Sequence, residues 1–220
     1  MNNYWLELWR ELIEANPHSP ESGPIKRYKA YAHRKIFRPD PLLNFVLEFV
    51  NGDTTIIDVG AGDGRWSIPL ARKGAKVTAI EPDRDVLRIL KENIHEAEVS
   101  VDILAAKWED AAVEEHDIVV SAHAIYADPD LSSFVRKMEE KAGKACFIAI
   151  RLPPADGAIA ELMNMIYGKI HDSANAVVAY NALYSMGIYV NVLVEENLKP
   201  WINDSFESAV LRAKHHLHLD

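Results

Sequence analysis

The chain has 220 residues, of which 49% are hydrophobic and 26% charged, and 24 basic against 33 acidic residues give a net charge of −9. This composition is typical of a globular domain and excludes a disordered, collagen-like or coiled-coil chain. The acidic surplus repels phosphate backbones and anionic lipid, so we expect neither a nucleic acid nor a membrane as partner. The one cysteine, Cys146, lies in an apolar run that predicts a buried strand. A chain without a disulfide framework suits the cytoplasm.

The first fifty residues predict an N-terminal helical segment, 1–50, that is separate from the rest. Apolar side chains recur at helical spacing over 4–15, 25–37 and 41–50. Because this segment precedes the first strand, we hypothesise that it forms a lid over a ligand. The residues with this hypothetical lid role are Tyr28, Tyr31 and Arg34.

From residue 51 onward, apolar strands alternate with helices, which predicts one domain over 51–220. The predicted strands are 54–59, 76–80, 99–104, 116–121, 145–150 and 188–194, and the predicted helices are 65–73, 83–95, 128–141 (capped by Asp128), 158–167 and 174–186. This alternation indicates a parallel sheet covered on both faces, a doubly wound three-layer αβα sandwich. Residues 153–172 interrupt the alternation as an insertion. The uncharged stretch 173–194 is long enough to cross a bilayer, but Gly187 divides it into a helix and a strand.

The turn after the first strand of this domain carries the chemistry. Glycines alternate over 60–64 between a strand and a helix, so a ligand can approach bare backbone there. A dinucleotide fingerprint, Gly-x-Gly-x-x-Gly, requires a glycine where this chain has Arg65. Asp58 precedes the glycines and suits a cationic amino group, while Glu81 ends the second strand and suits ribose hydroxyls. The pattern therefore favours a nucleoside that carries an amino acid.

These segments resemble the class I S-adenosylmethionine-dependent methyltransferases over about residues 54–150. Asp-Val-Gly-Ala-Gly-Asp-Gly at 58–64 is similar to the first motif of that family, and Val-Thr-Ala-Ile-Glu-Pro at 77–82 is similar to its second. Ser-Ala-His-Ala-Ile-Tyr at 121–126 resembles the motif beside the transferring methyl group. The resemblance implies the strand order 3-2-1-4-5-7-6. The sixth strand would be 188–194, and no convincing seventh follows it.

The resemblance also implies a set of cofactor-binding residues. The glycine turn would cradle the methionine part, the acid that ends the second strand would hold the ribose, and the stretch after the third strand would contact adenine. The residues implicated are Asp58, Gly60, Ala61, Gly62, Gly64, Glu81, Pro82, Lys107, Trp108, Glu109 and Ala122. Lys107 occupies a position where the family often has Asp, and Trp108 is expected to pack against the adenine face.

Methyl transfer releases a neutral thioether, so positioning and desolvation supply most of its acceleration. His123 is the candidate base for an acceptor that must lose a proton, and the alternative is that it only orients its loop. Tyr126 either hydrogen-bonds the acceptor or packs, and Arg151 pairs with an acidic acceptor or with a surface acid. The histidines within 215–218 are not expected to bind metal, because adjacent helical side chains point in different directions.

We therefore predict a methyltransferase that uses S-adenosylmethionine, without a metal, on a small-molecule acceptor. The acidic charge disfavours a nucleic-acid substrate, and so does the lack of an Asn/Asp-Pro-Pro-aromatic motif after the fourth strand. A homodimer is one possible assembly. Two alternatives remain open. A Rossmann-type NAD(P) oxidoreductase is disfavoured by Arg65 and Asp58, whereas a non-catalytic S-adenosylmethionine-binding or regulatory protein is not separated from an enzyme by the sequence.

Overall fold

The computed structural model describes residues 4–15, 40–152, 158–168, 173–195, 205–216 and 219. The strands are β1 (Thr55–Val59), β2 (Lys76–Ile80), β3 (Val101–Leu104), β4 (His116–Ala122) and β5 (Ala142–Ala149). The helices are α1 (Tyr4–Ala15), α3 (Pro41–Leu47), α4 (Ser67–Arg72), α5 (Arg84–Ala97), the 3-10 turn η2 (Ile125–Ala127), α6 (Leu131–Lys141), α7 (Ala158–Tyr167), α8 (Ala176–Ser185) and α9 (Phe206–His216). The helix expected over 25–37 and its three lid residues lie outside the described residues.

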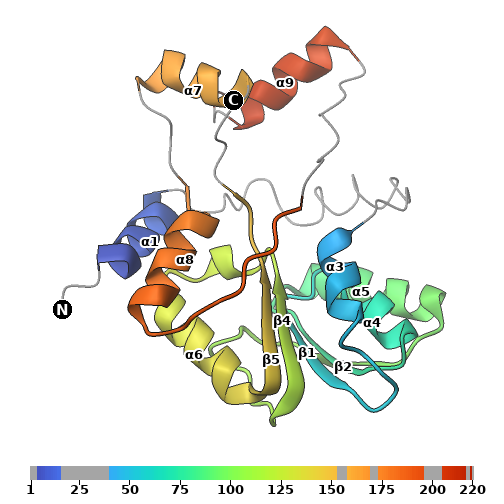
Figure 1. Cartoon of the computed structure of the whole chain (residues 1–220). Coiled ribbons are helices and arrows are strands. Elements are labelled where there is room, and N and C mark those ends of the chain that lie inside the picture. The colour runs from blue at the N-terminus through green and yellow to red at the C-terminus, as the bar shows by residue number, and fades with distance from the viewer. Residues whose placement is uncertain are drawn as a thin grey trace.

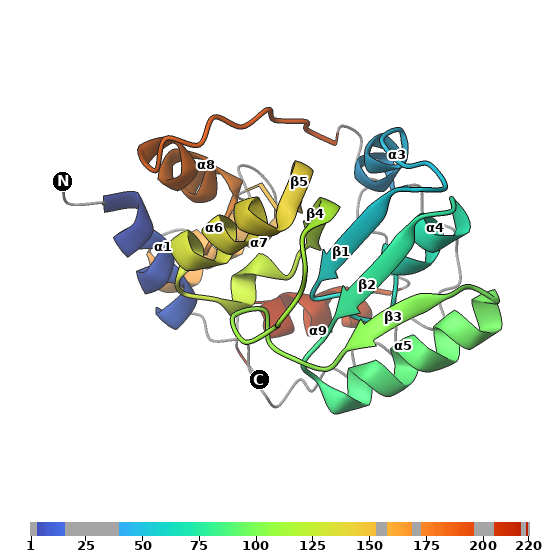
Figure 2. The same cartoon turned by 90° about the horizontal axis from the view of Figure 1, so that it is seen from below.

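The five strands form one sheet in the order β3-β2-β1-β4-β5, and every pair is parallel. Figure 2 shows this order from one edge of the sheet to the other. The order and the helices on both faces confirm the predicted three-layer αβα class. Asp58 is level with Ala79 of β2 and Val120 of β4, so it lies on the central strand, one residue before the carboxyl end of β1.

Two separate layers of apolar side chains cover the sheet. Trp9 of α1 packs with residues of α6 and α8 on one face, while α3 and α4 cover the other. In Figure 1 the first group lies to the left of β5, and α3, α4 and α5 lie above β1 and β2 on the right side of the view. Burial on both faces explains why the inner strands are rich in β-branched residues. No helix in the described ranges is long and apolar enough to cross a membrane.

The helix after β4 begins later than predicted. Its cap is Asp130, whose carboxylate accepts a hydrogen bond from the backbone N–H of Ser133, 3.1 Å away. Asp128, the predicted cap, instead accepts from the backbone N–H of Asp130 at 2.7 Å. Both residues are good caps, and η2, which the sequence did not predict, occupies the space before the helix and moves its start.

The predicted sixth strand is not formed. Residues 188–194 have no regular secondary structure, although their sequence favours a strand. A strand requires a hydrogen-bonded neighbour, and within the described residues β5 is the edge of the sheet. Tyr189 and Val192 are accordingly 79% and 63% exposed.

Cys146 lies in β5, as predicted, but its side chain is exposed rather than in the core. The side chain belongs to the edge strand, which is covered less than the inner strands. Its surroundings still desolvate the thiolate, and with the nearby Glu139 they raise the pKa of the thiol to about 11. Such a thiol is a poor nucleophile at neutral pH.

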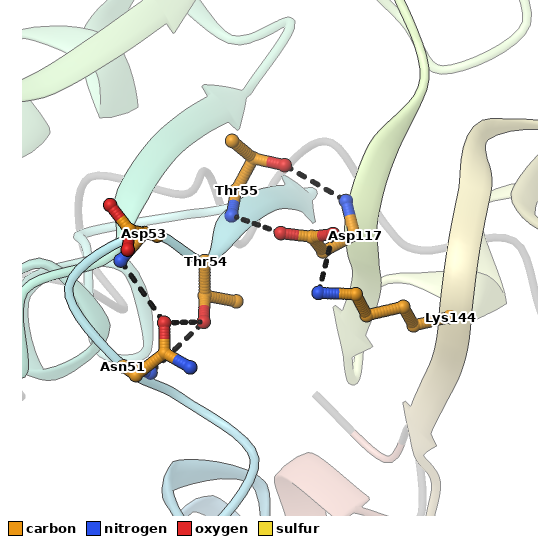
Figure 3. A network of polar contacts seen from close by, with 6 residues as sticks. All are labelled: Asn51, Asp53, Thr54, Thr55, Asp117 and Lys144. Atoms are coloured by element: carbon orange, nitrogen blue, oxygen red, sulfur yellow. Dashed lines mark hydrogen bonds and ion pairs between the residues drawn. The ribbon is translucent and has the colours of Figure 1, made fainter.

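Polar contacts fix the end of the sheet at which β1 begins. Asp117 accepts from the backbone N–H of Thr55 at 3.0 Å and pairs with Lys144 of β5 at 2.8 Å (Figure 3). The network therefore links β1, β4 and β5 at one end. The glycine turn, which follows Val59, lies at the opposite end of β1.

Candidate cofactor-binding site

The turn after β1 depends on backbone conformations that glycine tolerates. Gly60, Gly62 and Gly64 all have positive φ, at 71°, 59° and 89°. A β-carbon placed on Gly60 would overlap the side chain of Ala124, in the loop after β4. The glycine turn thus lies directly against the loop that carries the candidate catalytic residues.

Amide groups in this turn are used within the protein. The N–H groups of Gly60 and Ala61 both donate to the carbonyl of Ile80, at 2.8 and 3.0 Å, and that of Gly64 donates to the carbonyl of Ala61 at 3.0 Å. A pyrophosphate site needs such amides to face its ligand. Their engagement here argues against a dinucleotide and agrees with the replacement of the last fingerprint glycine by Arg65.

Glu81 lies beside the turn, as the second motif predicts. One carboxylate oxygen accepts from the N–H of Gly62 and the other from the N–H of Asp83, both at 3.0 Å. Burial is the largest influence on this carboxyl group and raises its pKa. Each carboxylate oxygen has more than one lone pair, so both can also accept from ribose hydroxyls. Pro82, between the two bonded residues, is exposed.

Asp58 is the most informative polar residue of the site. Its Oδ2 accepts from the Ser67 hydroxyl at 2.6 Å, while its Oδ1 is buried and has no hydrogen-bond partner in the described part of the chain. Desolvation raises the pKa of this carboxyl to about 6. A buried acceptor without a partner is costly and suits a ligand that donates to it. The ammonium group of a bound amino acid is such a donor.

The stretch after β3 differs from the expectation in one respect. The indole of Trp108 is only 5% exposed, and its Nε1 donates to the carbonyl of Phe134 at 3.0 Å. Core packing against α6 thus corrects the prediction that this ring stacks on adenine. Lys107 and Glu109 are exposed and form an ion pair at 3.3 Å.

The loop after β4 brings the two candidate catalytic side chains together. Ala122 ends the strand, and His123 follows it with a positive φ of 60°, its N–H donating to the carbonyl of Ala149 at 2.9 Å. The rings of His123 and Tyr126 are stacked, with centroids 6.4 Å apart. The imidazole is exposed and lies just after the carboxyl end of β4.

Tyr126 connects this loop to two other parts of the chain. Its hydroxyl accepts from the backbone N–H of Arg151 at 2.6 Å, and the Arg151 guanidinium lies 5.3 Å from its ring centre. Trp9 of α1 is stacked with it at 6.4 Å. Burial raises the pKa of the phenol. Tyr126 thus has clear packing and hydrogen-bonding roles within the protein.

Two contributors to the site were not singled out from the sequence. The Ser67 hydroxyl, in the first turn of α4, donates a hydrogen bond to Asp58. Ser67 follows Asp58 by nine residues, across the glycine turn, and this short separation is a signal that could have indicated the contact. Asp40 accepts from the indole N–H of Trp66 at 3.0 Å and pairs with Arg65 at 3.4 Å, so it ties α3 to the start of α4. Nothing in the sequence near Asp40 indicates this contact.

Comparison with known proteins agrees with this geometry. Residues 56–141 match the family model described as a methyltransferase domain. This stretch begins in β1 and ends with α6, so it contains the glycine turn, Glu81 and the loop after β4. Together with the strand order, the match shows that this part of the chain is similar to a methyltransferase domain.

Individual relatives extend the comparison. The chain is 40% identical over 84 residues to a ubiquinone biosynthesis O-methyltransferase of Methylobacterium sp. (strain 4-46), covering 37% of this chain and 34% of that protein. It is 31% identical over 151 residues to the protein of that name from Pseudomonas savastanoi pv. phaseolicola, covering 61% and 65%. The chain thus spans between about a third and two thirds of the length of these relatives.

A solved structure supports the fold. The magnesium protoporphyrin IX methyltransferase of Synechocystis PCC 6803 with bound S-adenosylhomocysteine superposes with a TM-score of 0.57 at 13% identity. The superposition covers 81% of this chain and 88% of that one. At this identity the likeness concerns the arrangement of helices and strands.

Proposed function

We propose that the protein transfers a methyl group from S-adenosylmethionine to a small molecule. The observation that carries the proposal is the buried, unpartnered Oδ1 of Asp58 on one side of the glycine turn, with the Glu81 carboxylate on the other. Asp58 suits the ammonium group and Glu81 suits the ribose. The backbone amides between them already donate hydrogen bonds within the protein, which disfavours phosphate. This combination matches an aminoacyl nucleoside and not a nicotinamide dinucleotide.

Each residue then has a definable task. Bound S-adenosylmethionine would supply an electrophilic methyl group, and the chain would position it. Glu81 holds the ribose and Asp58 holds the ammonium group of the cofactor, and Gly60, which has no β-carbon, lets the turn lie against Ala124. His123, at the carboxyl end of β4, accepts the proton of an acceptor hydroxyl. Tyr126, held by Arg151, forms the wall next to His123.

A small acceptor is favoured by the relatives and by charge. The curated relatives reported above act, by their names, in ubiquinone biosynthesis as O-methyltransferases, so a hydroxyl oxygen is the first acceptor to test. The net charge of −9 disfavours nucleic acid. The stacking of Trp9 on Tyr126 places α1 beside the loop that carries His123, and we propose that the segment 1–50 covers the site from there. We also propose that the protein is cytoplasmic, which the single cysteine supports. We further propose that it forms a homodimer.

The test is an assay of S-adenosylhomocysteine formation with a panel of phenols, catechols, small carboxylic acids and amines, and with RNA and DNA as separate arms. Turnover with a small molecule alone supports the proposal. Turnover with RNA or DNA alone contradicts the small-molecule assignment. Saturable S-adenosylhomocysteine binding without turnover on any acceptor favours the non-catalytic alternative. Binding of NADH without binding of S-adenosylhomocysteine favours the oxidoreductase.

A further inference from the structure

A single lysine of α6 holds the loop that follows β3. The ammonium of Lys137 donates to three backbone carbonyls, those of Trp108, Glu109 and Ala111, at 2.6, 3.0 and 2.8 Å. It also lies 4.7 Å from the centre of the Trp108 ring. An ammonium has three N–H donors, so all of them are engaged by this one loop.

The same loop has a second attachment to α6 one turn earlier. The Trp108 indole donates to the carbonyl of Phe134, and the two aromatic rings lie 6.2 Å apart. Within the loop, the N–H of Ala111 donates to the carbonyl of Trp108 at 3.2 Å. The backbone of 108–111 therefore has a defined orientation relative to α6.

This loop begins beside the acid assigned to the ribose. The backbone N–H of Glu81 donates to the carbonyl of Leu104, the last residue of β3, at 3.2 Å. A base attached to a ribose at Glu81 can therefore extend over the residues that follow Leu104. The loop 108–111 is within a few residues of that point.

Lys137 also sets the direction of a peptide group. Because the carbonyl of Trp108 points at Lys137, the N–H of Glu109, in the same trans peptide, points the opposite way. That N–H donates to no group in the described part of the chain. It is a fixed donor that faces away from α6, and it suits the ring nitrogen of a purine that accepts a hydrogen bond.

We propose that Lys137 is a positioning residue that fixes the loop 108–111 for recognition of the adenine ring. The proposal rests on the proposed function, because it assumes that S-adenosylmethionine binds at Glu81. Adenine N1 accepts a hydrogen bond, whereas N1 of hypoxanthine carries a proton and cannot. The N–H of Glu109, held in place by Lys137, would therefore discriminate between the two bases.

The experiment measures the affinities of the full chain for S-adenosylhomocysteine and S-inosylhomocysteine by calorimetry. Lys137→Met keeps the aliphatic stem and removes the donors, while Lys137→Arg keeps a cationic donor. Lys141→Met is the matched control, because it removes the same charge one turn later on α6, where Lys141 pairs with Glu140 at 3.0 Å. Near-ultraviolet circular dichroism of each variant reports whether the Trp108 environment is retained.

We expect the wild type and Lys141→Met to prefer S-adenosylhomocysteine by at least tenfold. Lys137→Met should bind it about tenfold more weakly and lose most of the preference, with Lys137→Arg in between. An unchanged preference in folded Lys137→Met, or an equal weakening for both ligands, would overturn the proposal. Should Lys137→Met fail to fold, Lys137→Arg decides: a preference for S-adenosylhomocysteine that is reduced relative to the wild type supports the proposal, and a wild-type preference contradicts it. Absence of S-adenosylhomocysteine binding by the wild type would defeat the proposed function itself.

Discussion

The two halves of the sheet carry different kinds of information. On the side of β1, β2 and β3, the site consists of a backbone turn and two acids that lie within about one strand–helix–strand unit. On the side of β4 and β5, it consists of side chains from α1, the loop after β4 and the end of β5. The family match includes the first half, β4 and the loop after β4, and it ends at residue 141, before β5.

This difference shows why the cofactor is easier to infer than the acceptor. A turn with positive φ values can be recognised from its glycines, because few other residues adopt that conformation. The surroundings of Tyr126 depend on contacts between distant segments. The bond from Trp9 to the carbonyl of Asp128 joins residues 119 positions apart. No local pattern in the sequence encodes such a contact.

We expect the largest effect from a substitution in the glycine turn, which belongs to the cofactor-binding half of the site. Gly60→Ala places a β-carbon against Ala124 and a side chain on a residue with φ of 71°. We expect S-adenosylhomocysteine binding to be lost and the free energy of unfolding to fall by about 2–5 kcal/mol, from strain and overpacking together. Calorimetry and denaturant unfolding measure both quantities.

Two further variants show whether the overlap itself is responsible. Gly52→Ala is the control, because a β-carbon there meets nothing within 4 Å. Adding Ala124→Gly to Gly60→Ala should restore part of the stability. Wild-type affinity in Gly60→Ala would show that the close approach of the turn to the loop after β4 has no bearing on binding.

A smaller effect is expected from a substitution in the loop after β4, which should change turnover without changing cofactor affinity. His123→Asn removes the imidazole and keeps a residue that tolerates the positive φ of 60°. If the imidazole is the base, kcat for a hydroxyl acceptor falls about 100-fold, because general-base catalysis contributes at least that much. The affinity for S-adenosylhomocysteine should change less than twofold. An unchanged kcat would remove His123 from the mechanism and leave it as a loop residue.

The pH dependence of cofactor binding sharpens the role of Asp58. Its pKa of about 6 lies above the ordinary 3.8, so the folded protein holds the proton more tightly than the unfolded chain. The free energy of unfolding should therefore fall by about 3 kcal/mol as pH rises from 4 to 6 and then stay level. An ammonium ligand needs the ionised form, so affinity should rise up to tenfold per pH unit below pH 6 and level off above it.

Two variants isolate this group from the other titrating residues. Asp58→Asn should remove the dependence, while Ser67→Ala should move its midpoint above pH 6, because the Ser67 hydroxyl favours the ionised carboxylate. Arg65 opposes the upward shift and Glu81 adds to it. A pH profile of S-adenosylhomocysteine affinity that is the same in Asp58→Asn and the wild type would contradict the role of Asp58.

Local patterns in the sequence were sufficient to predict some parts of the structure, whereas contacts between distant segments were not predictable. The parallel sheet and its strand order were predictable, because apolar strands alternate with helices and the glycine motif marks the first strand. The prediction of a strand over 188–194 was wrong, because a segment with strand propensity forms a strand only next to a hydrogen-bonded neighbour. Trp108 was misjudged because a large aromatic residue in a loop can equally enter the core. Ser67 and Lys137 act through contacts whose geometry only the folded chain shows.

The most direct test of the central claim is a calorimetric titration of S-adenosylhomocysteine into the wild type and Glu81→Ala. The account predicts saturable binding of one equivalent by the wild type. Glu81→Ala should bind more weakly by about 1.5–3 kcal/mol, because a charged acceptor of hydrogen bonds is lost. No binding by the wild type, or equal affinity in the two proteins, would contradict a nucleoside site between Asp58 and Glu81.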